Sequence, residues 1–109
     1  MVEIDDIEKR FRKFRNDFWE DVTEINAGES KLNTDEIKTK MTESEYFKTI
    51  KAFAEERGWS VVPKDLTLAV QKEGEEKTVE VTLVDTFEEN KLFIQPWSRV
   101  LQKLENLNK

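Results

Sequence analysis

The sequence predicts an α+β fold, because helical periodicity occupies both ends of the chain and a two-residue alternation occupies its middle. We expect a long N-terminal helix, one or two further helices, an antiparallel meander of three or four strands, and a C-terminal helix. Helices and strands come in separate runs rather than in alternation, which favours α+β over a parallel α/β sheet. The chain has 109 residues, close to the commonest domain size, so we expect one domain over residues 1–109.

The N-terminal helix is predicted from about Ile4 to Asn26. Asp5 and Asp6 lie in its first turn, where the helix dipole favours negative charge. Gly28 supplies the signal that ends the helix. The apolar side chains recur at spacings of three and four, which places them on one face. They are Ile4, Ile7, Phe11, Phe14, Phe18, Val22 and Ile25.

A short helix of about two turns is predicted after a loop over residues 28–33. Asn33 followed by Glu36 matches a capping pattern, and Ile37 and Met41 then lie on one helix face.

A longer helix is predicted from about Glu43 to Arg57. Thr42 followed by Glu45 is a second capping match, and Gly58 suits the C-terminal cap. Its buried stripe should contain Tyr46, Phe47, Ile50, Phe53 and Ala54.

From Trp59 onward the apolar period falls from about 3.6 to 2, which is the period of a strand. The loop around Gly74 predicts a hairpin. Polar residues alternate with the apolar ones, so we expect one sheet face to carry helices and the other to face water. The predicted strands are residues 59–62, ended by Pro63; Leu66, Leu68 and Val70; Val79, Val81 and Leu83; and residues 92–94, ended by Pro96. The last helix is predicted from Ser98 to about Leu107.

The chain contains 7 Phe, 3 Trp and 1 Tyr, and aromatic residues provide much of the area that a small core can bury. We expect most of the following to be inside: Phe11, Phe14, Phe18, Phe47, Phe53, Trp59 and Phe93.

The charge of the chain disfavours broad binding to nucleic acid or to anionic membranes. Its 24 acidic residues outnumber 18 basic ones, which gives a net charge of −6. No apolar run approaches the roughly 20 residues that span a bilayer. The acidic residues 1–6 show no signal-peptide core. We therefore expect a cytoplasmic protein that binds no membrane.

The residue content also excludes several kinds of chemistry. The chain has neither His nor Cys, so it can form no disulfide, no zinc–thiolate site and no Ser–His or Cys–His nucleophile. Its 3 glycines make no phosphate-binding loop. We expect no catalytic residue, no metal site and no cofactor, and hence not an enzyme.

A basic stripe, defined as residues 9–15, holds five positive charges. One interpretation is a nucleic-acid-binding surface with interleaved aromatic residues. The other, which we favour, is a solvated helix face, because acidic residues from Asp17 to Glu24 follow within about one Debye length of 8–10 Å. Acid-first pairs spaced by four residues would support the helix there: Asp5–Lys9, Asp6–Arg10 and Glu8–Arg12.

Two further nucleic-acid hypotheses are weaker. The order of helices followed by a hairpin resembles a winged helix-turn-helix, but the candidate wing at residues 72–77 is net negative and would repel phosphate. Asp65 with Glu75 and Lys77 matches the spacing of metal-dependent nucleases, but Glu75 falls at the hairpin tip, away from Asp65.

We therefore expect a small, acidic, non-enzymatic domain that acts by binding a protein partner or itself, as a homodimer. The alternative is a nucleic-acid-related protein, either an acidic mimic of DNA or a weak binder that uses residues 9–15. Trp97, at a strand-to-helix corner, is either an exposed anchor or a lid over the core. The candidate interaction residues are Phe11, Arg12, Phe14, Arg15, Phe18, Trp19 and Trp97.

Overall fold

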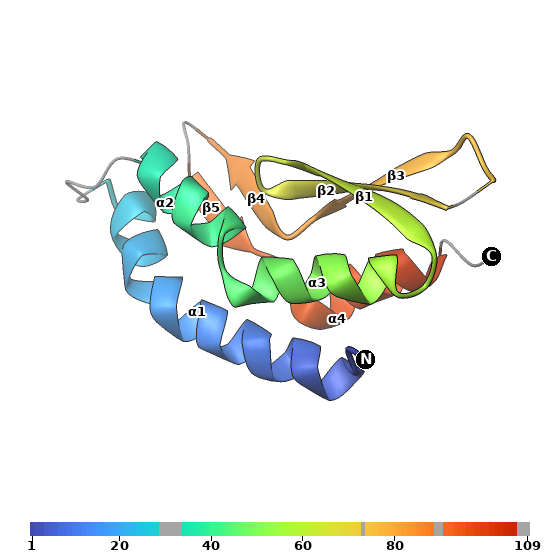
Figure 1. Cartoon of the computed structure of the whole chain (residues 1–109). Helices are drawn as coiled ribbons and strands as arrows, with labels where there is room; N and C mark the ends of the chain where they lie inside the picture. Colours follow the sequence, from blue (N-terminus) through green and yellow to red (C-terminus); the bar gives the residue numbers. More distant parts are fainter. Residues whose placement is uncertain (29–33, 73, 89–90, 107–109) are drawn as a thin grey trace.

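The computed structural model describes residues 1–28, 34–72, 74–88 and 91–106, and it confirms the α+β class (Figure 1). Three helices come first: α1 (Ile4–Asn26), α2 (Thr34–Thr42) and α3 (Glu45–Glu55). Five strands and a last helix follow: β1 (Trp59–Lys64), β2 (Thr67–Lys72), β3 (Thr78–Thr82), β4 (Val84–Phe87), β5 (Lys91–Ile94) and α4 (Trp97–Glu105).

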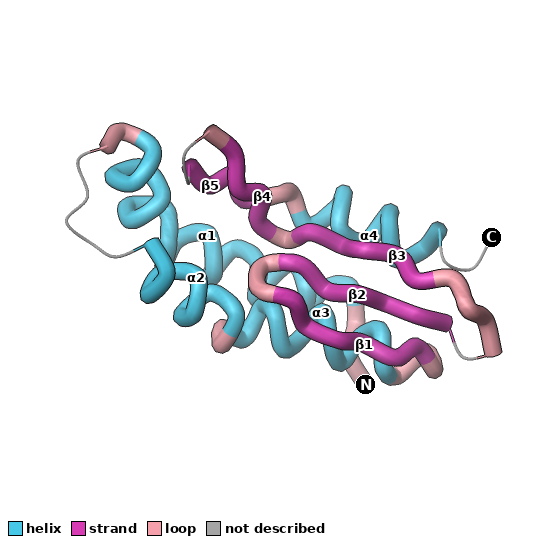
Figure 2. The backbone as a smooth tube through the Cα atoms, turned by 90° about the horizontal axis from the view of Figure 1, so that it is seen from above, coloured by secondary structure: helices cyan, strands magenta, loops and turns pink. Residues whose placement is uncertain are grey.

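The strands lie over a layer of helices. Figure 1 shows α1, α3 and α4 below the strands, and Figure 2 shows β1, β2 and β3 side by side above that layer. Leu68, Val70 and Val81 turn toward the helices and are buried, whereas Gln71 and Glu80 are exposed. Among the described helices, none is long and apolar enough to cross a membrane.

In the described part of the chain, the strands form two antiparallel sheets, a meander of β1, β2 and β3 and a hairpin of β4 and β5. The sequence did not predict β4, and Leu83 explains how this strand arises. The Leu83 N–H donates to the Leu66 carbonyl at 3.1 Å, and its own carbonyl accepts from the Gln95 N–H at 3.0 Å. The chain therefore bends at Leu83, leaves β2 and begins to pair with β5.

The start of α3 differs from the prediction, and the predicted cap of α2 lies outside the described residues. Thr42 does not cap α3, because it ends α2, where its hydroxyl donates to the Thr39 carbonyl at 2.8 Å. Ser44 is the cap instead, and its Oγ accepts from the Phe47 N–H at 3.4 Å. The predicted cap Asn33 falls outside the described residues, as does the predicted helix end at Leu107.

Pro63 does not end β1 as predicted but lies inside it, opposite Leu68. A proline has no N–H for a sheet to use, so it is tolerated on an edge strand. Because β1 is at the edge of the three-stranded sheet, Pro63 leaves the pairing with β2 intact.

Most of the aromatic residues expected inside are there. Phe14, Phe47, Phe53 and Trp59 are buried, while Phe11 and Phe18 are half-buried and pack against the core. Phe93 is the exception, since half of its side-chain area is exposed (50%). The reason is the alternation along β5: Leu92 turns toward the helices and is buried, so its neighbour turns to the other face.

Candidate functional site

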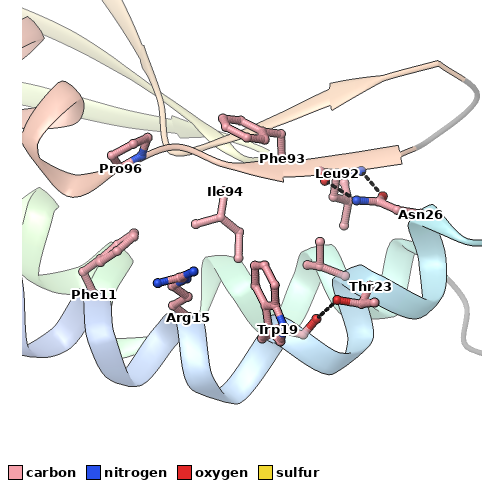
Figure 3. Close-up of a pocket in the computed structure, with 10 residues that line it drawn as sticks. Phe11, Arg15, Trp19, Thr23, Asn26, Leu92, Phe93, Ile94 and Pro96 are labelled. Atoms are coloured by element: carbon pink, nitrogen blue, oxygen red, sulfur yellow. Dashed lines mark hydrogen bonds between the residues drawn. The ribbon is translucent and has the colours of Figure 1, made fainter.

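The free edge of β5 is the starting point of the candidate site. On one side β5 pairs with β4, with Phe93 opposite Asp85 and Ile94 opposite Val84. On its other side, no strand in the described part of the chain pairs with it. Helix α1 runs beneath this edge (Figure 3).

Asn26, the last residue of α1, satisfies part of that edge. Its Nδ2 donates to the Leu92 carbonyl at 2.8 Å, and its Oδ1 accepts from the Leu92 N–H at 2.8 Å (Figure 3). One side-chain amide thus makes both bonds that a neighbouring strand would make with Leu92. The pair joins residues that are 66 positions apart.

The alternation of antiparallel pairing leaves Ile94 open on the same edge. Along such a strand, successive residues point their backbone N–H and C=O toward the partner strand and then away from it. Gln95 bonds toward the neighbouring strand through Leu83, whereas Leu92 bonds outward to Asn26. The backbone N–H and C=O of Phe93 therefore point toward β4, and those of Ile94 point outward. None of the hydrogen bonds found among the described residues occupies this outward N–H and C=O of Ile94.

A groove of about 490 Å³ opens between α1 and β5. In Figure 3 the side chains of Phe11, Arg15 and Trp19 rise from α1 toward β5, and Ile94 points down toward them. Phe93 flanks the groove from the opposite face of β5. Trp19 is 54% exposed, so two large aromatic side chains on either side of the free edge are half in water.

Arg15 is the charged residue of this groove. Its guanidinium carbon lies 4.9 Å from the centroid of the Trp19 ring, within the range of a cation–π interaction. In the described part of the chain no carboxylate lies within 4 Å of Arg15, and no other Lys, Arg, Asp or Glu lines the groove. The groove thus combines apolar walls with one unneutralised positive charge.

The structure brings Phe11, Arg15 and Trp19 together in this groove, out of the seven predicted interaction residues. The other four lie elsewhere, each in its own surroundings. Phe14 faces the core, with ring centroids 5.2 Å from Tyr46 and 5.8 Å from Phe47, and Phe18 packs beside it. Arg12 forms an ion pair with Glu8 at 2.6 Å, and Trp97 is half-buried against the core.

The basic stripe is partly neutralised by its own helix. Besides the predicted pair of Arg12 with Glu8, Lys13 lies 3.8 Å from Asp17. Asp6 does not pair with Arg10 as predicted, because its carboxylate accepts the Glu3 N–H at 2.9 Å and caps the helix instead. The predicted pair of Asp5 with Lys9 is also not within 4 Å.

The nuclease-like residues do not converge. Asp65 sits in the turn before β2 and lies 3.9 Å from Lys38, whereas Glu75 follows the other end of β2 and lies 3.9 Å from Lys72. A six-residue strand separates them, about 20 Å of extended chain. In the described ranges no group of three acidic side chains could hold a metal ion.

One buried polar group stands out in the core. The Tyr46 side chain is 1% exposed, and its hydroxyl has no hydrogen-bond partner among the described residues. Phe11, Phe14 and Phe47 surround its ring. Burial raises the pKa of this phenol well above its usual value.

Comparisons with protein-family models, with curated proteins and with solved structures found no match. The candidate site therefore stands on its own geometry. Sequence reasoning missed Asn26, Leu92 and Ile94, and it counted Phe93 among seven aromatic residues of which most were expected inside. No local signal marks the first two as partners, because their contact joins opposite ends of the chain.

Proposed function

We propose that this chain is a non-enzymatic interaction domain that binds a protein partner in the groove between α1 and β5. The observation that carries the proposal is the half-exposed pair of Trp19 and Phe93 beside a strand edge that is open at Ile94. Exposed apolar patches usually mark interaction sites, and Trp and Arg are enriched among the residues that dominate binding energy.

The available area supports a partner of modest size. Covering the exposed halves of Trp19 and Phe93 would contribute roughly 4–6 kcal/mol before the cost of association. Arg15 adds a charge-assisted contact for a carboxylate. These contributions suit a peptide segment better than a wide, flat interface.

Self-association through α1 remains a prediction, but its basis is narrower than the sequence suggested. The structure buries Phe14 and half-buries Phe11 and Phe18, so Trp19 is the aromatic residue of α1 whose side chain is exposed. A second copy is therefore the competing occupant of the same groove.

Photo-crosslinking in the cells that express the protein tests this proposal. A photoreactive phenylalanine analogue would replace Trp19 or Phe93 in the groove, and Val62 on β1 as the control. Val62 is matched because it is also a large apolar residue that is 56% exposed. We expect a discrete adduct from both groove positions and none from the Val62 position.

Two results would contradict the proposal. Equal crosslinking at all three positions would show that exposure alone determines the adducts. An adduct containing two tagged copies of this chain would assign the groove to a homodimer.

A further inference from the structure

We propose that the groove takes an extended segment of the partner, which adds as a short strand to the free edge of β5 at Ile94. This segment carries a large apolar residue that packs against Trp19, and a carboxylate two positions away that reaches Arg15. The inference rests on the proposed function and specifies the chemistry of its partner.

The backbone of Ile94 is the first argument. A free N–H and C=O on a sheet edge form a template for another strand, and peptide recognition by strand addition uses such edges. At Leu92 the same two bonds are already made by Asn26. Pro96 has no N–H to offer beyond Ile94. The open part of the edge is therefore short and suits a few extended residues.

The side chains along α1 provide the second argument. In an extended segment, residues two positions apart point to the same face. A segment paired with Ile94 would turn every second side chain toward α1, where Phe11, Arg15 and Trp19 line the groove. Because Arg15 has no carboxylate within 4 Å in the described residues, an acidic side chain at one of these positions is complementary in charge.

Two other occupants, a partner helix and a second copy of β5, fit the edge at Ile94 less well than an extended segment. A partner helix has satisfied its own backbone, so it would bury the N–H and C=O of Ile94 without partners. In a symmetric pairing of β5 with a second β5, the outward N–H and C=O of Leu92 would already be bonded to Asn26 in both copies.

The test begins with selection of displayed random heptapeptides against the whole chain. We expect enriched sequences with an apolar residue and Asp or Glu two positions apart. The synthetic peptide with blocked ends is then added to isotopically labelled protein, and amide hydrogen exchange is followed residue by residue. The Ile94 amide should exchange at least about tenfold more slowly with bound peptide, because it gains a hydrogen bond. The Phe93 amide, already directed toward β4, should change little.

Backbone methylation of the peptide gives a second readout that leaves the protein unchanged. Methylation of alternate amides that face β5 should weaken binding by about tenfold or more, as expected for a lost hydrogen bond. Methylation of the intervening amides should leave the affinity within about twofold. The variant Arg15→Gln should weaken binding, whereas Arg12→Gln, on the same helix and paired with Glu8, should not.

The outcomes separate the inference from the proposed function. If groove crosslinking succeeds but the Ile94 amide is not protected, and both methylation series behave alike, strand addition is wrong and the groove binds in another way. If the selected peptides bind unchanged to Trp19→Glu, the groove itself is not the site. Enrichment of helix-forming sequences without the apolar–acidic spacing would also overturn the inference.

Discussion

Two hydrogen bonds of 2.8 Å join the side-chain amide of Asn26 to the backbone of Leu92. The Asn26 Nδ2 donates to the Leu92 carbonyl, and the Asn26 Oδ1 accepts from the Leu92 N–H. This pair fixes the end of α1 against the edge of β5 and occupies half of the outward backbone groups on that strand. It therefore sets both the geometry of the groove and the length of edge that stays open.

Asn26→Ala should destabilise the fold by about 1–3 kcal/mol, because it leaves the backbone of Leu92 without its partners in a partly buried position. Urea unfolding followed by circular dichroism measures this difference. Asn16→Ala, an exposed change on the same helix, is the control and should stay within about 0.5 kcal/mol of the parent. Equal stability of the two variants would argue that the clamp does not hold α1 to β5.

Tyr46→Phe should raise the stability at neutral pH by about 1 kcal/mol, because it removes a buried hydroxyl that has no partner among the described residues. The aromatic packing with Phe11 and Phe14 remains. The urea midpoint of the two proteins measures the effect. A loss of stability on removing the hydroxyl would mean that it is hydrogen-bonded after all, for example to a buried water molecule.

Tyr46 should also make the unfolding free energy depend on pH in the alkaline range. Burial raises the pKa of Tyr46 in the folded state above the usual value of about 10, so the folded state keeps a proton that the unfolded state loses. This titration thus leaves the unfolding free energy unchanged below about pH 10 and lowers it as the pH rises further. The difference in unfolding free energy between the parent and Tyr46→Phe, measured from pH 9 to 11.5, should grow in favour of the variant. A constant difference over this range would contradict the burial of the phenol.

The basic stripe should not bind nucleic acid tightly. Arg12 and Lys13 are paired with acids, and Arg15 lies against Trp19. With a net charge of −6, we expect no dissociation constant below about 100 µM for a labelled duplex or single strand at physiological salt. Fluorescence anisotropy measures this. A low-micromolar affinity that disappears in Arg12→Glu with Arg15→Glu would restore the nucleic-acid alternative.

Local patterns predicted the helices well because their evidence is local. The recurring apolar positions and the acidic first turn predicted α1 from Ile4 to Asn26, and the structure has the same two ends. The start of α3 was placed two residues early, because Thr42 and Ser44 both suit a cap and only the end of α2 decides between them.

The site was harder to predict because it depends on long-range packing. The strand β4, with the sequence Val-Asp-Thr-Phe, has no apolar alternation of its own and forms where the chain bends at Leu83. Without β4, nothing shows which edge of β5 is free or which way Phe93 turns. Trp19 and Arg15 were identified as interaction residues, but their grouping with Ile94 required the fold.

The role of the groove is tested most directly by calorimetric titration of the selected heptapeptide into three proteins: the parent, Trp19→Glu and Val62→Glu. Both variants replace a half-exposed apolar side chain, one in the groove and one on β1, so both should fold. The proposed function predicts that Trp19→Glu raises the dissociation constant by about tenfold or more, while Val62→Glu stays within about twofold of the parent. Unchanged binding to Trp19→Glu, or a loss confined to Val62→Glu, would contradict it.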